Sequence, residues 1–535
     1  MNRKKYVFLY LLPAVSGMVC FLLLYGIRVL NPLYDAWLLR GGDLTQHYIG
    51  WEFYRVSEWQ FPVGLMNRIA YPNNVSVIFT DSIPVFAVLF KLLSPVLPET
   101  FQYFGWWQML CFVLQGIFAA QLIYFFTEDE KAAAAGSLFF ILAPVFLTRV
   151  FFHVALSSQW LILAALYLAL KYIGGGKGLR TCAVIWGLTG MLCGAVHIYY
   201  IPMCGIIMSA FLLLRFLRDK KLLFPLGVGM SFVMGAGGMV FILGGLSHDH
   251  QLDAGGLGQF SFNMNGFVNP MGWSRLLPWL SSYGEGAGDG FAYLGLGIII
   301  LAIFAVILQI SAWGRVKRTD KNLPAFLLIA VICLFVSASH QFALDGNHVY
   351  EIPYPDKLVS LWGMFRSSGR FIWPVVYLIM LWVIVTAVNQ IKNKYAVLLL
   401  LGVTFFLQIY DIQGAIRSRC DGFRTETVYN SRLQDERWEE IAQGKKHIVF
   451  VSRVTQNQDI LYGVSQYAYL HGMTINDFYL AHSAAEGDIV SSREESMHNL
   501  REDTIYIFKQ QDESMCGDYG LEYQTLDDII VGLKK

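Results

Sequence analysis

Two pairs of polar side chains, each with members four residues apart, could do chemistry in this chain. Asp43 and His47 occur in the stretch GGDLTQHYIG, and Arg366 and Arg370 occur in FRSSGRF. Side chains at this spacing share one face of a helix. A carboxylate beside an imidazole can take the proton of a hydroxyl group, and guanidinium groups bind phosphate oxygens through forked hydrogen bonds. The sequence therefore contains the parts of a proton-transfer site and of an anion site.

Both pairs also have a structural interpretation. Asp43 could cap a helix that begins there, with Gln46 as the reciprocal partner of a capping box. His47 would then be a hydrogen-bonded residue near the membrane surface. Arg366 and Arg370 would anchor a neighbouring apolar span to lipid headgroups. Residue types and spacing leave both interpretations open.

Four other polar side chains could contact a substrate. Asp81 lies shortly before Pro84, where it could instead cap a second helix. Arg149 and His153 should face the protein interior or a wet cavity, because a charge is costly in hydrocarbon. Lys91 lies in an apolar segment and could serve as a third cation or simply extend its amine to the headgroups.

One loop clusters residues of metal-ligand type, namely His248, Asp249, His250 and Asp253. Imidazole and carboxylate ligands suit zinc or a hard divalent ion, but this spacing matches no familiar closed site and the flanking sequence is rich in glycine. We therefore expect no cofactor, with a divalent metal at this loop as the alternative.

The elements that position these residues must belong to a membrane protein. Hydrophobic residues make up 55% of the 535 residues, charged residues make up 15%, and the mean hydropathy is +0.47. This composition is typical of polytopic membrane proteins and argues against a soluble one. A formal net charge of +1 without a basic tract gives no indication of nucleic-acid binding.

Apolar runs long enough to cross a bilayer number about eleven. They cover residues 6–30, 103–126, 132–150, 154–173, 180–197, 199–217, 222–246, 289–313, 323–340, 371–390 and 394–411. The first run is too long for the core of a signal peptide and is expected to remain as a helix. Residues 83–97 are shorter and contain Lys91, so we expect an amphipathic helix in the membrane interface.

Basic residues decide the orientation, since cytoplasmic loops are rich in lysine and arginine. If residues 83–97 do not cross, all basic clusters fall on one side; they lie at residues 3–5, 171–180, 215–221, 315–321 and 392–394. The N-terminus is then cytoplasmic. The segments outside the cell membrane are residues 31–102, 149–158, 247–288, 341–370 and everything after 411.

The first outer segment is expected to hold two interfacial helices. The first would begin at Asp43 and present two different sides. Its apolar side would be formed by Leu44, Tyr48, Trp51 and Trp59, and the other side by Asp43, His47, Gly50 and Tyr54. The second would cover residues 83–97.

Residues 412–535 differ in character from residues 1–411, and we expect a domain boundary between them. Strand-like pieces at residues 447–451 and 504–508 alternate with helix-like pieces at 460–470 and 525–533, which predicts a small α/β domain. Cys420 and Cys516 are the two cysteines of this domain. They could pair if the domain is exported, or remain free.

This layout resembles the membrane glycosyltransferases of the GT-C fold, which share one N-terminal span, a long outer loop opening with an acidic residue, many further spans and an outer soluble domain. The resemblance implies an α-helical polytopic protein with a GT-C-like bundle of about eleven transmembrane helices and an extracytoplasmic α/β domain. It also implies transfer of a sugar, with inversion, from a polyprenyl-phosphate donor to an extracytoplasmic glycan, lipid or protein acceptor.

The same resemblance implies roles for the residues described above. Asp43 matches the aspartate of the first outer loop, which acts as base or positions the acceptor. The donor phosphate would be bound by Arg366, Arg370 and Lys91. The other substrate contacts would come from His47, Asp81, Arg149 and His153.

Three short strings are similar to a bacterial family of polytopic proteins that carries no assigned activity. They are FTDSIP at residues 79–84, GFAYLG at 290–295 and FRSSGRF at 365–371. This second resemblance supports a bacterial plasma membrane and leaves the reaction open.

Two other functions fit a polytopic protein with outer polar segments. A transporter or flippase of a lipid-linked glycan would be expected to carry charged pairs deep within its spans and internal repeats. A non-enzymatic membrane assembly protein would not need Asp43.

Overall fold

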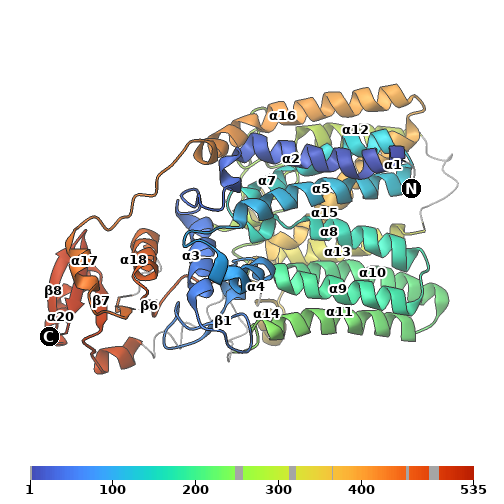
Figure 1. The fold of residues 1–535 in the computed structure, drawn as a ribbon. Coiled ribbons are helices and arrows are strands. Elements are labelled where there is room, and N and C mark those ends of the chain that lie inside the picture. Colours follow the sequence, from blue (N-terminus) through green and yellow to red (C-terminus); the bar gives the residue numbers. More distant parts are fainter. Residues whose placement is uncertain are drawn as a thin grey trace.

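The structure is a computed structural model that describes residues 3–247, 257–311, 321–363, 365–452, 457–480 and 493–534. Long helices pack side by side in a bundle, and a small domain built on a sheet lies beyond one end of it (Figure 1). The N-terminus lies at the opposite end of the bundle. The protein is therefore mostly helical, with a small C-terminal sheet domain as expected.

Eight helices of the described residues are long and apolar enough to cross a membrane. They cover Arg3–Tyr25 (which contains α1, Arg3–Tyr6, and α2, Leu12–Tyr25), α5 (Phe104–Thr127), Ala155–Gly174 (which contains α8, Trp160–Leu168), α9 (Leu179–Val196), α10 (Tyr200–Asp219), α11 (Leu223–Ile242), Ser368–Gln390 (which contains α15, Trp373–Gln390) and α16 (Lys394–Arg424).

The number of spans depends on three further segments. The bent pair α6 (Glu130–Ile141) and α7 (Pro144–Val150) counts as a ninth span if it crosses as one. Helices α12 (Leu296–Ser311) and α13 (Leu323–Ala338) are apolar but have only 16 residues each. Such helices are about 24 Å long, against a hydrocarbon core of about 30 Å. The expected number of about eleven is reached only if both of them cross as well.

The C-terminal domain contains a five-stranded mixed sheet with the order β6-β5-β7-β9-β8. Its elements are α17 (Arg437–Ala442), β5 (His447–Phe450), α18 (Gln458–Leu470), β6 (Thr474–Ile475), β7 (Thr504–Phe508), α20 (Glu513–Asp518), β8 (Glu522–Leu526) and β9 (Ile529–Leu533). The strands expected at residues 447–451 and 504–508 and the helix expected at 460–470 are confirmed. Helix α16 runs on to Arg424, so the expected domain boundary after residue 411 falls inside a helix.

The helix expected over residues 525–533 is wrong. These residues form the end of β8, a two-residue turn and β9, and the two strands pair antiparallel. Asp527 and Asp528 have positive φ values of 45° and 61°, the geometry of a type I′ hairpin turn. The following residues, Ile529 to Val531, are β-branched and favour strands. The turn chemistry outweighs the helical spacing on which the expectation rested.

Cys420 and Cys516 are both free. Cys420 is buried in α16 and Cys516 in α20, in two separate hydrophobic clusters. Their pairing would require the two clusters to come together.

The first expected interfacial helix is present as α3 (Gly42–Val56), but it is buried within the protein on all sides from Leu44 to Tyr54. Tyr48 and Trp51 from its expected apolar side are buried, and so are His47 and Tyr54 from the other side. The reason is visible in Figure 1: α3 lies between the bundle and α18 of the C-terminal domain. The second expected helix is α4 (Pro84–Leu93).

The C-terminal domain is attached to the first outer segment by main-chain hydrogen bonds. The N–H of Tyr71 donates to the carbonyl of Ile475 at 2.9 Å, and the N–H of Ile475 donates to the carbonyl of Arg68 at 2.8 Å. These bonds tie the edge strand β6 to a turn of the segment before β2. At the α3–α18 contact, Nε2 of Gln466 donates to Oε1 of Glu52 at 3.3 Å.

Short elements complete the outer segments. They are β1 (Leu65–Met66), β2 (Val75–Ser76), the 3-10 turn η3 (Val77–Thr80), β3 (Gln341–Leu344), β4 (Asn347–Glu351), α14 (Asp356–Gly363) and the 3-10 turn η8 (Ser368–Ile372).

Candidate active site

A cavity of about 230 Å³ lies where segments between the long helices meet the C-terminal domain. Its polar lining residues are Asp43, Gln46, Asp81, His153, His197, Tyr199, Asp289, Arg366, Ser367, Arg370 and Tyr479. The structure therefore brings together five residues that the sequence singled out. Tyr479 belongs to the C-terminal domain, so both domains contribute to one cavity.

Asp43 lies in the first turn of α3, but it is not the helix cap. The N-cap is Gly41, whose N–H donates to Oγ1 of Thr45 at 2.7 Å, so the expected capping box is wrong. Gly41 and Gly42 adopt φ values of 89° and 65°, which glycine reaches without strain. The Asp43 side chain is left half-buried at the cavity wall, without a hydrogen bond or ion pair among the described residues.

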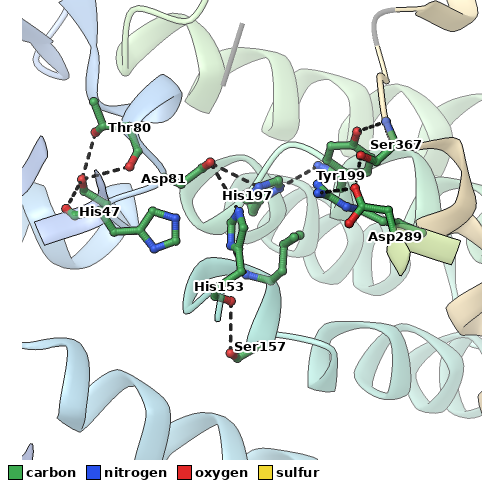
Figure 2. Close-up of polar contacts among 12 residues, drawn as sticks. His47, Thr80, Asp81, His153, Ser157, His197, Tyr199, Asp289 and Ser367 are labelled. Carbon is green, nitrogen blue, oxygen red and sulfur yellow. Dashed lines mark hydrogen bonds and ion pairs between the residues drawn. The ribbon is translucent and has the colours of Figure 1, made fainter. Parts of the chain in front are cut away.

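Asp81 faces two histidines across the cavity wall (Figure 2). Its carboxylate lies 3.2 Å from Nε2 of His197 and 3.5 Å from Nε2 of His153. It does not cap α4, whose N-cap is Ile83. Burial raises the pKa of the Asp81 carboxyl, but the two imidazoles outweigh this effect and hold that pKa well below its usual range. Asp81 is therefore a buried, ionised carboxylate.

The main chain fixes the tautomers of these two histidines. The N–H of Leu156 donates to Nδ1 of His153 at 3.4 Å, and the N–H of Tyr199 donates to Nδ1 of His197 at 3.3 Å. A neutral imidazole that accepts at Nδ1 carries its proton on Nε2. Burial lowers the pKa of His197, which favours the neutral ring. Both rings can thus donate an Nε2–H to Asp81.

His47 lies behind this group and is 0% exposed. Its ring centroid is 4.5 Å from that of His153, and neither of its nitrogens has a hydrogen-bond partner among the described residues. Burial, followed by the nearby His153, lowers the pKa of His47 well below its ordinary value. His47 is a neutral imidazole and does not line the cavity.

Three of these side chains have the donor types of a metal site. His47, Asp81 and His153 each offer one ligand atom, and these atoms lie within 4.8 Å of one another. Atoms bound to one tetrahedral zinc ion would lie about 3.3 Å apart. His153 would also need its proton on Nδ1, where the N–H of Leu156 now points. The donor types suit zinc, and the 3.5 Å between Asp81 and Nε2 of His153 is close to the zinc spacing, but the tautomer of His153 is not the one that a zinc ligand at Nε2 needs. The loop kept as an alternative metal site, with His248, Asp249, His250 and Asp253, lies outside the described residues.

Asp289 binds two of the expected arginines. Its Oδ1 lies 3.1 Å from Nη2 of Arg149, and its Oδ2 lies 2.9 Å from Nη2 of Arg370. The hydroxyl of Ser367 also donates to Asp289 (Figure 2). Burial raises the pKa of Asp289, but Arg370 and Arg149 outweigh it and hold that pKa below its usual range. Two positive charges thus share one carboxylate, and Arg149 itself does not line the cavity.

Arg366 differs from Arg370. It is exposed, lines the cavity, and has no carboxylate partner among the described residues. Its guanidinium carbon lies 4.5 Å from the ring centroid of Phe260, another lining residue. A guanidinium held against a ring keeps its N–H groups free for an anion.

Lys91 is not brought to the cavity. Its amine lies 4.1 Å from the ring centroid of Tyr54 and 4.6 Å from that of Trp59, and it donates to the carbonyl of Glu58 at 3.4 Å. The side chain is buried, so the expected extension of the amine to the headgroups is wrong. Its position gives no support to phosphate binding.

Sequence reasoning missed five lining residues, which are His197, Tyr199, Asp289, Ser367 and Tyr479. Ser367 lies within the string FRSSGRF, and Asp289 directly precedes GFAYLG, so two of the strings that carried a resemblance pointed to them. His197 was signalled by its place as the last residue of the apolar run 180–197. For Tyr479 the sequence held no signal.

Residues 14–413 match the family described as a domain of unknown function, DUF6311, and residues 437–534 match the DUF6311 C-terminal domain. The chain belongs to this family. The expected resemblance to a polytopic family without assigned activity is thereby confirmed. No curated protein matches this DUF6311 chain.

Two solved structures similar to the DUF6311 chain come from Archaeoglobus fulgidus. The oligosaccharyltransferase in its apo form is 12% identical with a TM-score of 0.46, covering 95% of this chain and 70% of that one. The archaeal oligosaccharyltransferase AglB in complex with an inhibitory peptide and a dolichol-phosphate is 11% identical with a TM-score of 0.45, covering 96% and 70%. Likeness at this level does not transfer residues or activity to this chain.

Proposed function

We propose that the protein is a GT-C-like membrane glycosyltransferase, which moves a sugar with inversion from a polyprenyl-phosphate donor to an extracytoplasmic glycan, lipid or protein. Its N-terminus is cytoplasmic and its C-terminal domain lies outside the cell membrane. One observation carries the proposal. A single cavity holds a carboxylate, Asp43, and a guanidinium, Arg366, neither of which has an ion-pair partner in the described parts of the chain.

These two groups match the two demands of an inverting transfer. Asp43 takes the proton of the acceptor hydroxyl as the hydroxyl oxygen attacks the anomeric carbon. The bond between that carbon and the phosphate oxygen breaks, and its electron pair leaves with the lipid phosphate. Arg366 binds the phosphate oxygens, where negative charge grows. Arg370 adds a positive charge that Asp289 offsets only in part, because Asp289 is shared with Arg149.

The other expected substrate residues divide into two groups. Asp81 and His153 line the cavity and contact the sugar hydroxyls, for which an ionised carboxylate is a strong acceptor. His47 packs against His153, and Arg149 binds Asp289, so these two position their neighbours. Lys91 has no part in this arrangement.

The test uses the purified full-length protein in lipid nanodiscs with a panel of polyprenyl-phosphate and polyprenyl-pyrophosphate sugars. We expect release of the lipid phosphate with at least one donor. Asp43→Asn should lower the rate by at least about 10²-fold, the usual contribution of a positioned base. Glu58→Gln is the matched control, because Glu58 is exposed in the same outer segment and does not line the cavity. The proposal fails if no donor is consumed or if Asp43→Asn keeps full activity.

A further inference from the structure

A second cavity, of about 200 Å³, lies where residues 71 and 72 of the first outer segment meet the C-terminal sheet. Tyr71 and Pro72 line it from the first outer segment, and the other lining residues belong to the C-terminal domain. It shares no lining residue with the active-site cavity. The transfer chemistry proposed above makes no use of it.

One residue that lines this second cavity, Asn476, has a hydrogen-bond donor without a partner among the described residues. Asn476 is 2% exposed, and its Oδ1 accepts the N–H of Phe450 at 2.8 Å. This bond fixes the amide, so that Nδ2 is its free end. Nδ2 is buried and has no hydrogen-bond partner among the described residues. Buried donors are seldom left unpaired, so this amide calls for a ligand oxygen in the cavity.

An acceptor and a rigid wall complete the site. The carboxylate of Glu495 lines the cavity and has no ion pair or hydrogen bond among the described residues. The ring of Tyr71 stacks on that of His447 with centroids 4.4 Å apart and planes at 19°. A hydrogen bond of 2.7 Å between Nδ1 of His447 and Oγ1 of Thr474 holds the imidazole in place.

The charged and polar groups of the cavity limit the chemical class of ligand that it can bind. An anion would meet the carboxylate of Glu495, and Arg501 would not compensate because it lies 2.8 Å from Asp503 in an ion pair. A cation would meet the N–H groups of Asn476. Hydroxyl groups satisfy both, since each can accept from the amide and donate to the carboxylate. Ligand sites for drug-sized molecules are larger, at about 300–1,000 Å³, so this cavity suits one small unit.

We propose that this cavity binds one ring of a neutral saccharide, at a site separate from the active-site cavity. Asn476 donates to a ring hydroxyl, Glu495 accepts from another, and the stacked Tyr71 and His447 form a fixed wall. The proposal does not depend on the transfer reaction. If the transfer also occurs, the site would hold part of a glycan acceptor beside the cavity where the transfer takes place.

The test measures sugar binding by the full-length protein in nanodiscs, using saturation-transfer NMR with disaccharides of glucose, galactose and N-acetylglucosamine. Two variants change exposed residues that line the cavity. Glu495→Ala removes the acceptor, and Asn499→Trp fills the cavity. Glu494→Ala is the matched control, because Glu494 is exposed on the same stretch and does not line the cavity. Asp43→Asn is the control for sugar bound in the active-site cavity, which Asp43 lines.

We expect at least one disaccharide to bind the wild type. Binding should weaken on the order of tenfold in Glu495→Ala, as for one lost hydrogen bond to a charged group, and disappear in Asn499→Trp. It should be unchanged in Glu494→Ala and Asp43→Asn. Binding that survives both site variants, binding that is lost in Asp43→Asn, displacement by inorganic phosphate, or no binding at all would each overturn the proposal. A protein that binds the sugar but transfers none refutes the proposed function and leaves this site standing.

Discussion

Asp289 lies 2.9 Å from the guanidinium of Arg370 and fixes that arginine at the start of the span that contains α15. Arg366 lies only four residues earlier but has no such partner among the described residues. The two arginines look alike in the sequence and yet differ in their contacts. Arg370 belongs to a part-buried network with Asp289 and Arg149, whereas Arg366 is free to meet a ligand.

Replacing Arg366 should therefore weaken donor binding without weakening the fold. In Arg366→Ala we expect the KM for the lipid-phosphate donor to rise on the order of tenfold, because one charge-assisted hydrogen bond is lost. The thermal midpoint should stay at the wild-type value. Arg366→Lys should recover only part of the affinity, because an amine cannot form a fork on the phosphate. An unchanged KM in Arg366→Ala would remove this residue from the phosphate site.

Replacing Asp289 should instead lower the stability of the fold. Asp289→Asn leaves Arg149 and Arg370, which are 10% and 14% exposed, without their shared part-buried carboxylate. Removing one partner of a well-buried ion pair costs about 3 kcal/mol, which is the upper bound here. We expect a clear loss of resistance to thermal and denaturant unfolding. The control is Asp435→Asn, which breaks a pair with the exposed Arg437 and should change stability little. Equal stability of the two variants would show that the buried network is not a structural unit.

Metal removal should leave the transfer intact. Asp81 already faces the Nε2 atoms of His153 and His197, and the N–H of Leu156 occupies Nδ1 of His153. Binding an ion would break these contacts. We expect activity to survive dialysis against EDTA and 1,10-phenanthroline. Activity that is lost on chelation and restored by zinc or manganese would contradict the tautomers assigned here.

The orientation of the chain can be tested with two single-cysteine positions. Helix α9 ends next to His197 of the active-site cavity and spans about 27 Å, so its start lies at the far side of the bundle. Lys177→Cys, just before α9, should be labelled by an impermeant maleimide only after the cells are permeabilised. Ser94→Cys, after α4, should be labelled in intact cells. Both native residues are at least partly accessible. The reverse pattern would invert the proposed topology.

The sequence predicted the long helical segments and placed several site residues in the segments between them, because span length depends on composition alone. It could not predict the partner of Asp81. The histidines that hold it come from the loop after α7 and from the end of α9, and only packing brings them together. The interfacial interpretation of α3 failed for a related reason. An apolar helix side fits lipid and a second protein surface equally well, and here Tyr48 packs on Phe104 while Trp51 packs on Phe101 and Tyr103.

Glu52 of α3 gives a final prediction for this domain contact, because its carboxyl is buried against Gln466 of α18. Burial raises the pKa of Glu52 to about 8, although the bond from Gln466 opposes the shift. The folded protein thus keeps a proton that the unfolded chain releases near its ordinary value of 4.5. Stability should fall as pH rises between these values, by about 1.4 kcal/mol per pH unit, and level off above about 8. Glu52→Gln keeps the hydrogen bond but cannot titrate, so its melting temperature should depend less on pH between about pH 5 and 9. If the melting temperatures of the variant and the wild type change with pH in the same way, Glu52 is not protonated in the folded protein.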